Sequence, residues 1–501
     1  MMIGKGKFLF NLLGITIVGF WIVMMGILVK KTGSSEKATG QVNEDSIAII
    51  NAAQREWKEI YLKDRKVGYS VNLIKPFEKG YFIQEETFLK LNLMGLGRSV
   101  YTVTQSGVDE KFILQNFFFK MTSGVVNYSV SGKVEGNQLL IKTGKGRRKR
   151  TKKITLLKPP MIGAGIGPLL KTLKISVGET FRIPFFDPST MAQEEAVFRV
   201  VGREQIRINK IDYNAFRLET EIWGRLLTSW IDEKGVILKE EGFMGLSIVK
   251  SSAANAPMDI EEGGEEDFYE MTAVPVDRKL PKPGRLSYLK IKLEGIDDVN
   301  IPKRSWDSGR QRFRNGIMEV DREKSPFKAS YAIPYNEPDD KLAPFLDPEF
   351  NIESDLKEII EKARDIAGKD KNPVSVSGML LRWVYENLDK RPVVSIPSAL
   401  EVLQTRVGDC NEHATLLTAL LRASGIPARL AIGIVYSRNK FFYHAWTEAY
   451  VGEWISMDAT LNQFPADVSH IRLMQGNLDK QVEIMGLIGK LKLEVLDFKY
   501  D

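Results

Sequence analysis

Hydrophobic and polar positions alternate with a period of two along much of the first half of the chain. Runs such as GYFIQEETFLKLNL (80–93), KFILQNFFFKM (111–121) and AVFRVVGREQI (196–206) carry apolar residues at about every second position, and Gly, Asn and Asp separate them. This period is typical of strands with one buried face, and short spacings between strands indicate antiparallel pairing. The pattern predicts a mostly antiparallel β domain over 56–255.

The pattern changes twice in the second half. The segment 256–284 contains EEGGEED without the residue order of a calcium-binding loop, so we interpret it as an acidic linker. A small β-rich region is expected over 285–349, beginning with RLSYLKIKLEG. Beyond it, 354–368 and 376–388 have the period of amphipathic helices, which predicts a C-terminal α+β domain over 350–501.

The N-terminus is apolar without a period. Residues 8–29 are interrupted only by Asn11 and Thr16, and at 1.5 Å per residue such a helix crosses a hydrocarbon core of about 30 Å. The sequence therefore predicts a membrane anchor over 1–31, followed by a polar linker over 32–55. A cleavable signal peptide is the alternative, although its apolar region would span only about 7–15 residues.

The flanking charges bear on membrane orientation. Two lysines precede the apolar segment and two follow it, so the short basic tail favours a cytoplasmic N-terminus. We expect a single-pass protein of a bacterial inner membrane with a periplasmic body. The expected fold class is α+β: a transmembrane helix, antiparallel β regions and a C-terminal α+β domain.

Charge adds little about partners. The chain has 71 Lys and Arg against 64 Asp and Glu, for a formal net charge of +7. The densest basic run, GKGRRKRTKK (144–153), could lie near anionic lipid or nucleic acid, but the run itself holds no aromatic residue and it reads more simply as a solvated hairpin. We expect no nucleic-acid partner, and the oligomeric state is left open.

A glycine-rich segment, GAGIGP (163–168), superficially suggests a phosphate-binding loop. It lacks the full G-x-G-x-x-G spacing and has no surrounding βαβ pattern. We interpret it as a glycine-rich connection.

The single cysteine of the chain, Cys410, lies in RVGDCNEHATLLTALLRASGIPAR (406–429). Asp409 is a good N-cap and Gly425 a good helix end, which predicts a helix over 410–424 with Cys410 in its first turn, facing inward. Helix N-termini stabilise thiolates, which would suit a nucleophile. A buried cysteine is equally often a small apolar filler, so the helix alone leaves both interpretations open.

Two downstream residues favour the nucleophile. His444 lies in KFFYHAWTEAYV (440–451) and Asp458 in EWISMDATLNQFP (453–465), both in strand-like contexts. A thiol needs a base to accept its proton, and an imidazole needs an acceptor that fixes its tautomer. Cys410, His444 and Asp458 supply these three roles.

With these residues the sequence resembles the transglutaminase-like superfamily, which is related to papain-like thiol proteases. The resemblance rests on Gly-Asp-Cys, Gly-Ile-Pro-Ala-Arg, His-Ala-Trp and Asp-Ala-Thr, in that order, over about 388–476. It implies a papain-like α+β domain with Cys410 as nucleophile, His444 as base and acid, and Asp458 orienting His444.

Neighbouring residues offer other interpretations. His413 could contact Cys410 on the helix, but the resemblance takes the base from a strand. We interpret His470 as a structural residue at the domain edge, and Trp446 and Trp454 as packing residues. Three scattered histidines and one cysteine do not form a usual metal cluster, so neither a metal nor a cofactor is expected.

Such a site would attack an amide carbonyl and form a thioester acyl-enzyme. With water as acceptor the protein would be a protease or amidase, which we favour; with an amine it would be a protein-glutamine cross-linking transferase. The expected substrate is a protein or peptide, such as an envelope protein or cell-wall peptide. An inactive transglutaminase-like module that serves binding or assembly is the alternative of another class.

Overall fold

The computed structural model describes two compact units, one within residues 50–271 and one within 272–500. The described residues are 50–144, 150–173, 175–222, 225–261, 267–296, 306–324, 328–337, 340–476 and 484–500. The domain boundaries expected from the sequence stay a prediction.

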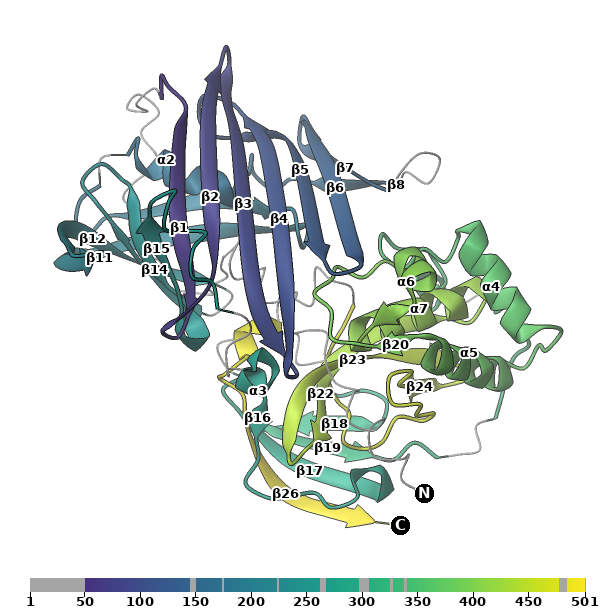
Figure 1. Cartoon of the computed structure of the whole chain (residues 1–501). Helices are drawn as coiled ribbons and strands as arrows, with labels where there is room; N and C mark the ends of the chain where they lie inside the picture. The colour runs from purple at the N-terminus through teal and green to yellow at the C-terminus, as the bar shows by residue number, and fades with distance from the viewer. Residues whose placement is uncertain are drawn as a thin grey trace. The chain divides into compact units, whose positions relative to one another are not determined.

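The 50–271 unit is built on one 15-stranded sheet with the order β8-β7-β6-β5-β4-β3-β2-β1-β15-β14-β13-β12-β11-β10-β9 (Figure 1). Its strands are β1 (Gln54–Leu62), β2 (Arg65–Phe77), β3 (Gly80–Leu93), β4 (Leu96–Val108), β5 (Leu114–Ser123), β6 (Val126–Glu135), β7 (Gln138–Thr143), β8 (Arg150–Thr155), β9 (Met161–Ile162), β10 (Thr180–Asp187), β11 (Ala192–Ile208), β12 (Ile211–Ile222), β13 (Arg225–Ile231), β14 (Ile237–Glu241) and β15 (Leu246–Ser251). The helices are α2 (Gly163–Leu170), η4 (Phe243–Gly245) and α3 (Phe268–Thr272), which ends at the unit boundary.

Local sequence explains most of this sheet. In β3, buried and partly exposed side chains alternate, as the period of two requires when one face packs on a core. Neighbouring strands pair in antiparallel fashion except β9 and β10. Of the basic run at 144–153, residues 150–153 lie in β8, which pairs with β7 in antiparallel fashion, and residues 145–149 lie outside the described residues.

The 272–500 unit contains two larger sheets. One has the order β16-β23-β22-β25, with β24 paired to β23, and the other has the order β18-β19-β17-β26. The strands are β16 (Val274–Pro275), β17 (Leu286–Glu294), β18 (Gln311–Arg314), β19 (Ile317–Asp321), β22 (Ala428–Ser437), β23 (Lys440–Tyr450), β24 (Trp454–Met457), β25 (Ile471–Gln475) and β26 (Lys492–Tyr500). A short parallel pair joins β20 (Asp389–Lys390) to β21 (Val407–Gly408).

One helix packs on the first of these sheets, and three others pack on that helix. The helices are α4 (Lys357–Ala367), α5 (Pro373–Asn387), α6 (Ala399–Thr405) and α7 (Cys410–Ala423). The unit also has the short 3-10 turns η5 (Pro283–Arg285), η7 (Ala343–Phe345) and η8 (Met485–Leu487). Helix α7 packs against β22 and β23 and is almost wholly buried (Figure 1). The Thr447 hydroxyl on β23 donates to the Ala414 carbonyl on α7 at 3.1 Å, which ties helix to strand.

The expected α+β fold class is wrong for the chain. Strands account for 49% of the residues and helices for 17%, so the protein is mostly β. The physical reason is the size of the 15-stranded sheet, together with the second sheet of the other unit, in which β17 pairs with both β19 and β26. Most of the α-helical residues that the structure describes belong to α4–α7, and α7 packs on the β16-β23-β22-β25 sheet.

The prediction of a transmembrane helix and of an inner-membrane localisation is not supported either. The predicted anchor over 1–31 and most of the linker over 32–55 lie outside the described residues. Within the described part of the chain, no helix is long and apolar enough to cross a membrane. The longest, α5, has 15 residues, which at 1.5 Å per residue falls short of a hydrocarbon core of about 30 Å. A single-pass inner-membrane protein with a periplasmic body is therefore unsupported.

Candidate functional site

The first turn of α7 is held by a reciprocal pair of hydrogen bonds. Asp409 is the N-cap and its carboxylate accepts from the Asn411 amide at 3.3 Å, while the Glu412 carboxylate accepts from the Asp409 amide at 2.8 Å. This capping box satisfies donors that a helix N-terminus leaves without partners. The predicted N-cap is confirmed, and Cys410 begins the helix.

Cys410 faces into the unit from this turn and is 0% exposed. Burial raises the pKa of its thiol well above the usual value, and the charge of Asp409 adds to the effect, although a hydrogen bond from the Ala445 backbone amide on β23 opposes it. The expectation that the helix N-terminus lowers this pKa is therefore wrong. Desolvation and neighbouring carboxylates outweigh the helix dipole. The thiol is neutral at pH 7 and lies beside the residue that follows His444.

His444 lies in the middle of β23, opposite Gly433 of β22. Gly433 allows β25 to approach: a Cβ atom there would lie 1.9 Å from the Ile471 carbonyl oxygen. This close approach pairs the start of β25 with β22 at Gly433, the residue that on its other side pairs with His444 of β23. The strand order β23-β22-β25 thus gathers residues that are far apart in the sequence.

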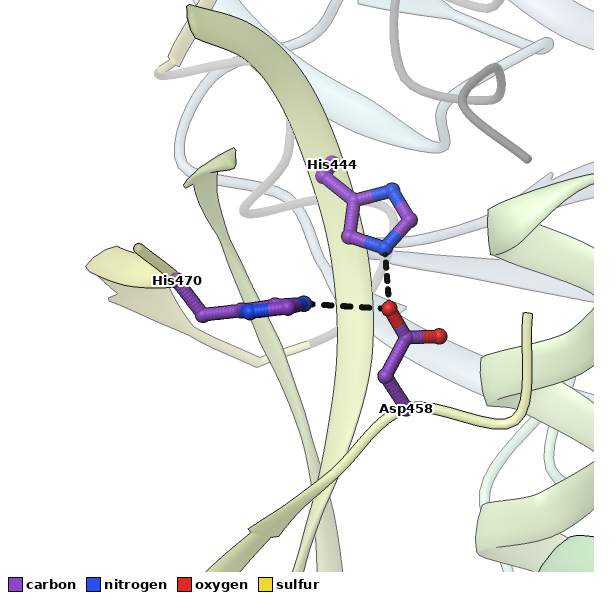
Figure 2. Close-up of side chains that lie close together, drawn as sticks. All are labelled: His444, Asp458 and His470. Atoms are coloured by element: carbon purple, nitrogen blue, oxygen red, sulfur yellow. Dashed lines mark hydrogen bonds and ion pairs between the residues drawn. The ribbon is translucent and has the colours of Figure 1, made fainter. Parts of the chain in front are cut away.

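Asp458 directly follows β24 and connects to His444. The Nε2–H of His444 donates to Asp458 Oδ2 at 2.7 Å (Figure 2). Asp458 Oδ1 accepts from the backbone amides of Thr460 at 2.7 Å and Leu461 at 3.1 Å. Burial alone would raise the pKa of Asp458, but the imidazole partners hold it well below its usual range. The group is therefore a carboxylate with each oxygen accepting two hydrogen bonds.

His470 is the second imidazole on Asp458. Its Nε2 lies 3.0 Å from the same Oδ2 atom, and its Nδ1 lies 3.2 Å from Asp467 Oδ1 (Figure 2). Burial would lower the pKa of His470, but Asp458 and Asp467 raise it to about 9, so the ring is an imidazolium at pH 7. The sequence interpretation missed this contact, because only the 466–471 loop and β25 bring His470 back to Asp458.

A segment outside the predicted C-terminal domain positions this loop. The Arg310 guanidinium donates to the carbonyl oxygens of Asp467 at 3.0 Å and His470 at 3.1 Å, and also contacts that of Ala466. Gln311 on β18 donates to the Arg472 carbonyl at 3.0 Å and accepts from the Arg472 amide at 2.6 Å. Their sequence context, a short polar stretch before a strand, offered no signal for this role.

The remaining candidates have structural partners. His413 donates from Nδ1 to the Asp409 carbonyl at 2.6 Å, and burial lowers its pKa to about 4, which makes it a weak base. The Trp446 ring lies 5.3 Å from the His470 ring and 6.3 Å from that of His444. Trp454 stacks under the Arg429 guanidinium at 3.8 Å. These contacts favour packing roles for both tryptophans. They also favour a structural role for His413, which hydrogen-bonds within the first turn of α7.

The ligand atoms of His444, Asp458 and His470 lie within 4.8 Å of one another, a spacing that a metal ion could bridge. Both imidazoles, however, donate directly to one carboxylate oxygen instead of pointing at a common site between the three groups. Direct hydrogen bonding accounts for the arrangement, and we do not identify these residues as metal ligands.

Comparison with protein families gives one match. Residues 360–459 match the Transglutaminase-like superfamily, so the chain contains a transglutaminase-like domain. The match ends one residue past Asp458 and leaves out His470. It supports an enzyme of the thiol hydrolase or transferase kind. The comparison with curated proteins found no match.

Several solved structures are similar over parts of the chain. A candidate cysteine protease from Cytophaga hutchinsonii has 20% identity and a TM-score of 0.27, covering 43% of this chain and 86% of its own. A β-barrel-like protein of a domain of unknown function from Brucella abortus has 12% identity and a TM-score of 0.31, covering 40% and 95%. A candidate protease from Parabacteroides distasonis has 12% identity and a TM-score of 0.20, covering 72% and 64%.

Proposed function

We propose that the protein is a cysteine hydrolase that cleaves amide bonds of a protein or peptide through an acyl-enzyme on Cys410. The observation that carries the proposal is the orientation of His444. Its Nε2 is bound to Asp458, while its Nδ1 is buried and has no hydrogen-bond partner among the described residues. The neutral ring therefore presents an unprotonated nitrogen, which is what a general base needs.

The proton of the Cys410 thiol would move to His444 Nδ1 during attack. Because the thiol is neutral in the resting site, a preformed thiolate–imidazolium pair is not required. The sulfur would bond to the carbonyl carbon, and His444 would return the proton to the leaving amine. Water, activated by the same ring, would then hydrolyse the thioester and release the acid and the free thiol.

The charges around Asp458 suit this step. Asp458 and Asp467 are carboxylates and His470 is an imidazolium, so these three groups carry a net charge of −1. When His444 accepts the proton, it becomes the second cation beside the two anions. We infer that His470 is a positioning residue, because it holds Asp458 in place and sets how strongly the carboxylate stabilises His444 in its cationic form.

Oxyanion stabilisation would begin at the helix. The Cys410 amide is at the first position of α7, where no intrahelical acceptor is available to it. That amide would donate to the developing oxyanion, which lies close to the sulfur in a tetrahedral intermediate. Cys410, His444, Asp458 and His470 are all 0% exposed, so a substrate reaches the thiol only after the covering side chains move.

The test is a search for Cys410-dependent products in the full chain. The protein would be incubated with a mixed peptide library and, separately, with the same library plus a tagged primary amine. We expect new amino termini or released ammonia, little tag incorporation, and a thioester-linked mass on Cys410 after an acid quench. Cys410→Ala should abolish the new amino termini, the released ammonia and the thioester-linked mass. Asp458→Asn should lower the rate of product formation by about 10²–10⁴-fold.

Two results would contradict the proposal. Products that persist in Cys410→Ala would exclude the thiol as nucleophile. Tag incorporation that exceeds hydrolysis would replace water by an amine as the acceptor and make the protein a transferase.

A further inference from the structure

The 50–271 unit contains a cavity of about 130 Å³ between α2 and the sheet. Helix α2 is formed by the glycine-rich segment, and it is tied to the sheet where the Asn72 amide donates to the Ala164 carbonyl at 3.0 Å. Apolar side chains from α2 and from the β10–β13 strands line one part of the cavity; they include Ile166, Leu170, Phe185, Phe198 and Leu218. The cavity therefore has a wall that accommodates a compact apolar group.

A second set of lining residues is polar and regularly spaced on β1, β2 and β3. Glu56 on β1 pairs with Asn72 on β2, and Asn72 pairs with Glu85 on β3. Side chains of directly paired residues lie on the same face of a sheet, so these three form a row, with Lys58 beside it on β1. All four line the cavity.

The charges in this row do not balance. Lys58 binds Glu240 at 3.0 Å, and Lys171 binds Glu56. Glu85 is left without an ion pair or hydrogen bond among the described residues. Burial raises the pKa of Glu85 to about 7, with Lys58 opposing the shift and Glu240 adding to it. Three carboxylates thus face two ammonium groups, and Glu85 has no cation of its own.

Two further acceptors point to the same chemistry. Asn72 Oδ1 and Thr220 Oγ1 are buried and have no hydrogen-bond partner in the described part of the chain. Thr220 is only 2% exposed, and both residues line the cavity. Buried polar atoms of native proteins normally make hydrogen bonds, so we expect a bound group to supply hydrogen-bond donors to these two oxygens. Glu85, Asn72 and Thr220 together offer oxygen acceptors to a group that carries several N–H bonds.

We propose that this cavity binds a small organic ammonium ion, with a primary ammonium against Glu85 and a compact apolar body against Phe185, Phe198 and Leu218. A primary ammonium has three donors, and its charge would balance Glu85. The cavity is close in volume to one of about 150 Å³ that holds benzene, so the apolar body is limited to about that size. An anion would face an excess of carboxylates, and a neutral alcohol would bring one donor and no charge. The site is independent of the proposed function of the other unit.

The test uses benzylammonium as the probe, with benzyl alcohol as its neutral counterpart of nearly equal shape. Calorimetry on the full chain at pH 8 should show saturable binding of benzylammonium and at least about tenfold weaker binding of benzyl alcohol. Glu85→Gln should weaken benzylammonium binding about tenfold or more, which corresponds to about 1.4 kcal/mol. Glu85→Gln removes a carboxyl whose ionised form is disfavoured by burial, so the variant should fold.

Glu86→Gln is the matched control, because Glu86 lies on the same strand but does not line the cavity and instead accepts from Tyr101 and Gln84. Its affinity for benzylammonium should equal that of the unaltered protein. The affinity of the unaltered protein for benzylammonium should also rise from pH 6 to pH 8, because Glu85 ionises over this range. The charged groups that face Glu85 keep their ion pairs over the same range; they are Lys58, Lys171, Glu56 and Glu240. Three results would overturn the proposal. They are equal affinity for benzyl alcohol and benzylammonium, an unaltered affinity for benzylammonium in Glu85→Gln, and a crystal soak that shows only water in the cavity.

Discussion

At the scale of single residues, the candidate site depends on one carboxylate that serves two imidazoles. Asp458 Oδ2 accepts from both His444 and His470, and the His470 ring is held from its other side by Asp467. The two imidazole rings lie 5.6 Å apart. A positive charge on one therefore affects the other, at an effective dielectric constant of about 20, by about 3 kcal/mol.

His470→Gln should shift the acid limb of the pH–rate profile to higher pH. Glutamine retains a donor for Asp458 but removes the positive charge that disfavours an imidazolium on His444. The measurement is the hydrolysis rate from pH 5 to 9, with thermal unfolding recorded in parallel. His413→Gln, which replaces another buried imidazole, should leave the limb in place. A lower rate with an unshifted limb would mean that His470 is only structural.

The thiol of Cys410 should react slowly with iodoacetamide at pH 6 and faster as the pH rises towards 10. Its raised pKa keeps it protonated at neutral pH, and full burial limits access. Because the chain has one cysteine, the mass added to the whole protein reports on this residue alone. Fast labelling at pH 6 that His444→Ala abolishes would instead show a preformed thiolate–imidazolium pair.

At the scale of elements, the site depends on the close packing of β22 against β25. Gly433→Ala places a methyl group against the Ile471 carbonyl, which cannot move without disturbing the pairing of β25. We expect a loss of about 2–4 kcal/mol in the free energy of unfolding and a larger loss of activity, because His470 directly precedes β25. Urea unfolding measures the first effect and peptide hydrolysis the second.

Gly378→Ala provides the comparison for this change. Gly378 lies inside α5, where an added Cβ would meet Phe464 only at an ordinary distance of 3.8 Å. Alanine favours helix over glycine, so this variant should be unchanged or more stable by up to about 1 kcal/mol. Equal destabilisation by the two substitutions would argue against a special role for the β22–β25 approach.

At the scale of the whole molecule, two groups with raised pKa values should each make the stability of the chain fall as the pH rises, over different pH ranges. The pKa of His470 is raised from its ordinary 6.5 to about 9, so its stabilisation is complete below pH 6.5 and is lost as the pH rises towards 9. The pKa of Glu85 is raised from 4.5 to about 7, so the 50–271 unit loses stability between those values as the pH rises. Each effect has an upper bound of about 3 kcal/mol.

Thermal unfolding of the full chain from pH 4 to 10 checks this assignment. Glu85→Gln should flatten the decline between pH 4.5 and 7, and His470→Gln should flatten the decline between pH 6.5 and 9. Unaltered pH dependence in either variant would show that other groups control that range.

Local patterns predicted a large part of this protein. The alternation in the first half anticipated the antiparallel strands, and Asp409 and Gly425 anticipated both ends of α7 to within one residue. The pairing of His444 with Asp458 was expected because an imidazole base needs an acceptor, and because the resemblance to the transglutaminase-like superfamily implies it. These features could be predicted because strand period, helix capping and motif spacing are properties of neighbouring residues.

Tertiary structure alone decided the rest. The mostly β character follows from the pairing of distant strands, and the contact of His470 with Asp458 follows from the approach of β25 to β22 that Gly433 permits. The raised pKa values of Cys410 and Glu85 follow from burial and from charges brought in by other elements. The sequence by itself determined which chemical groups are present and which local elements carry them. Only the folded chain set their distances, their solvent exposure and hence their charge, because each of these depends on residues that are remote in sequence.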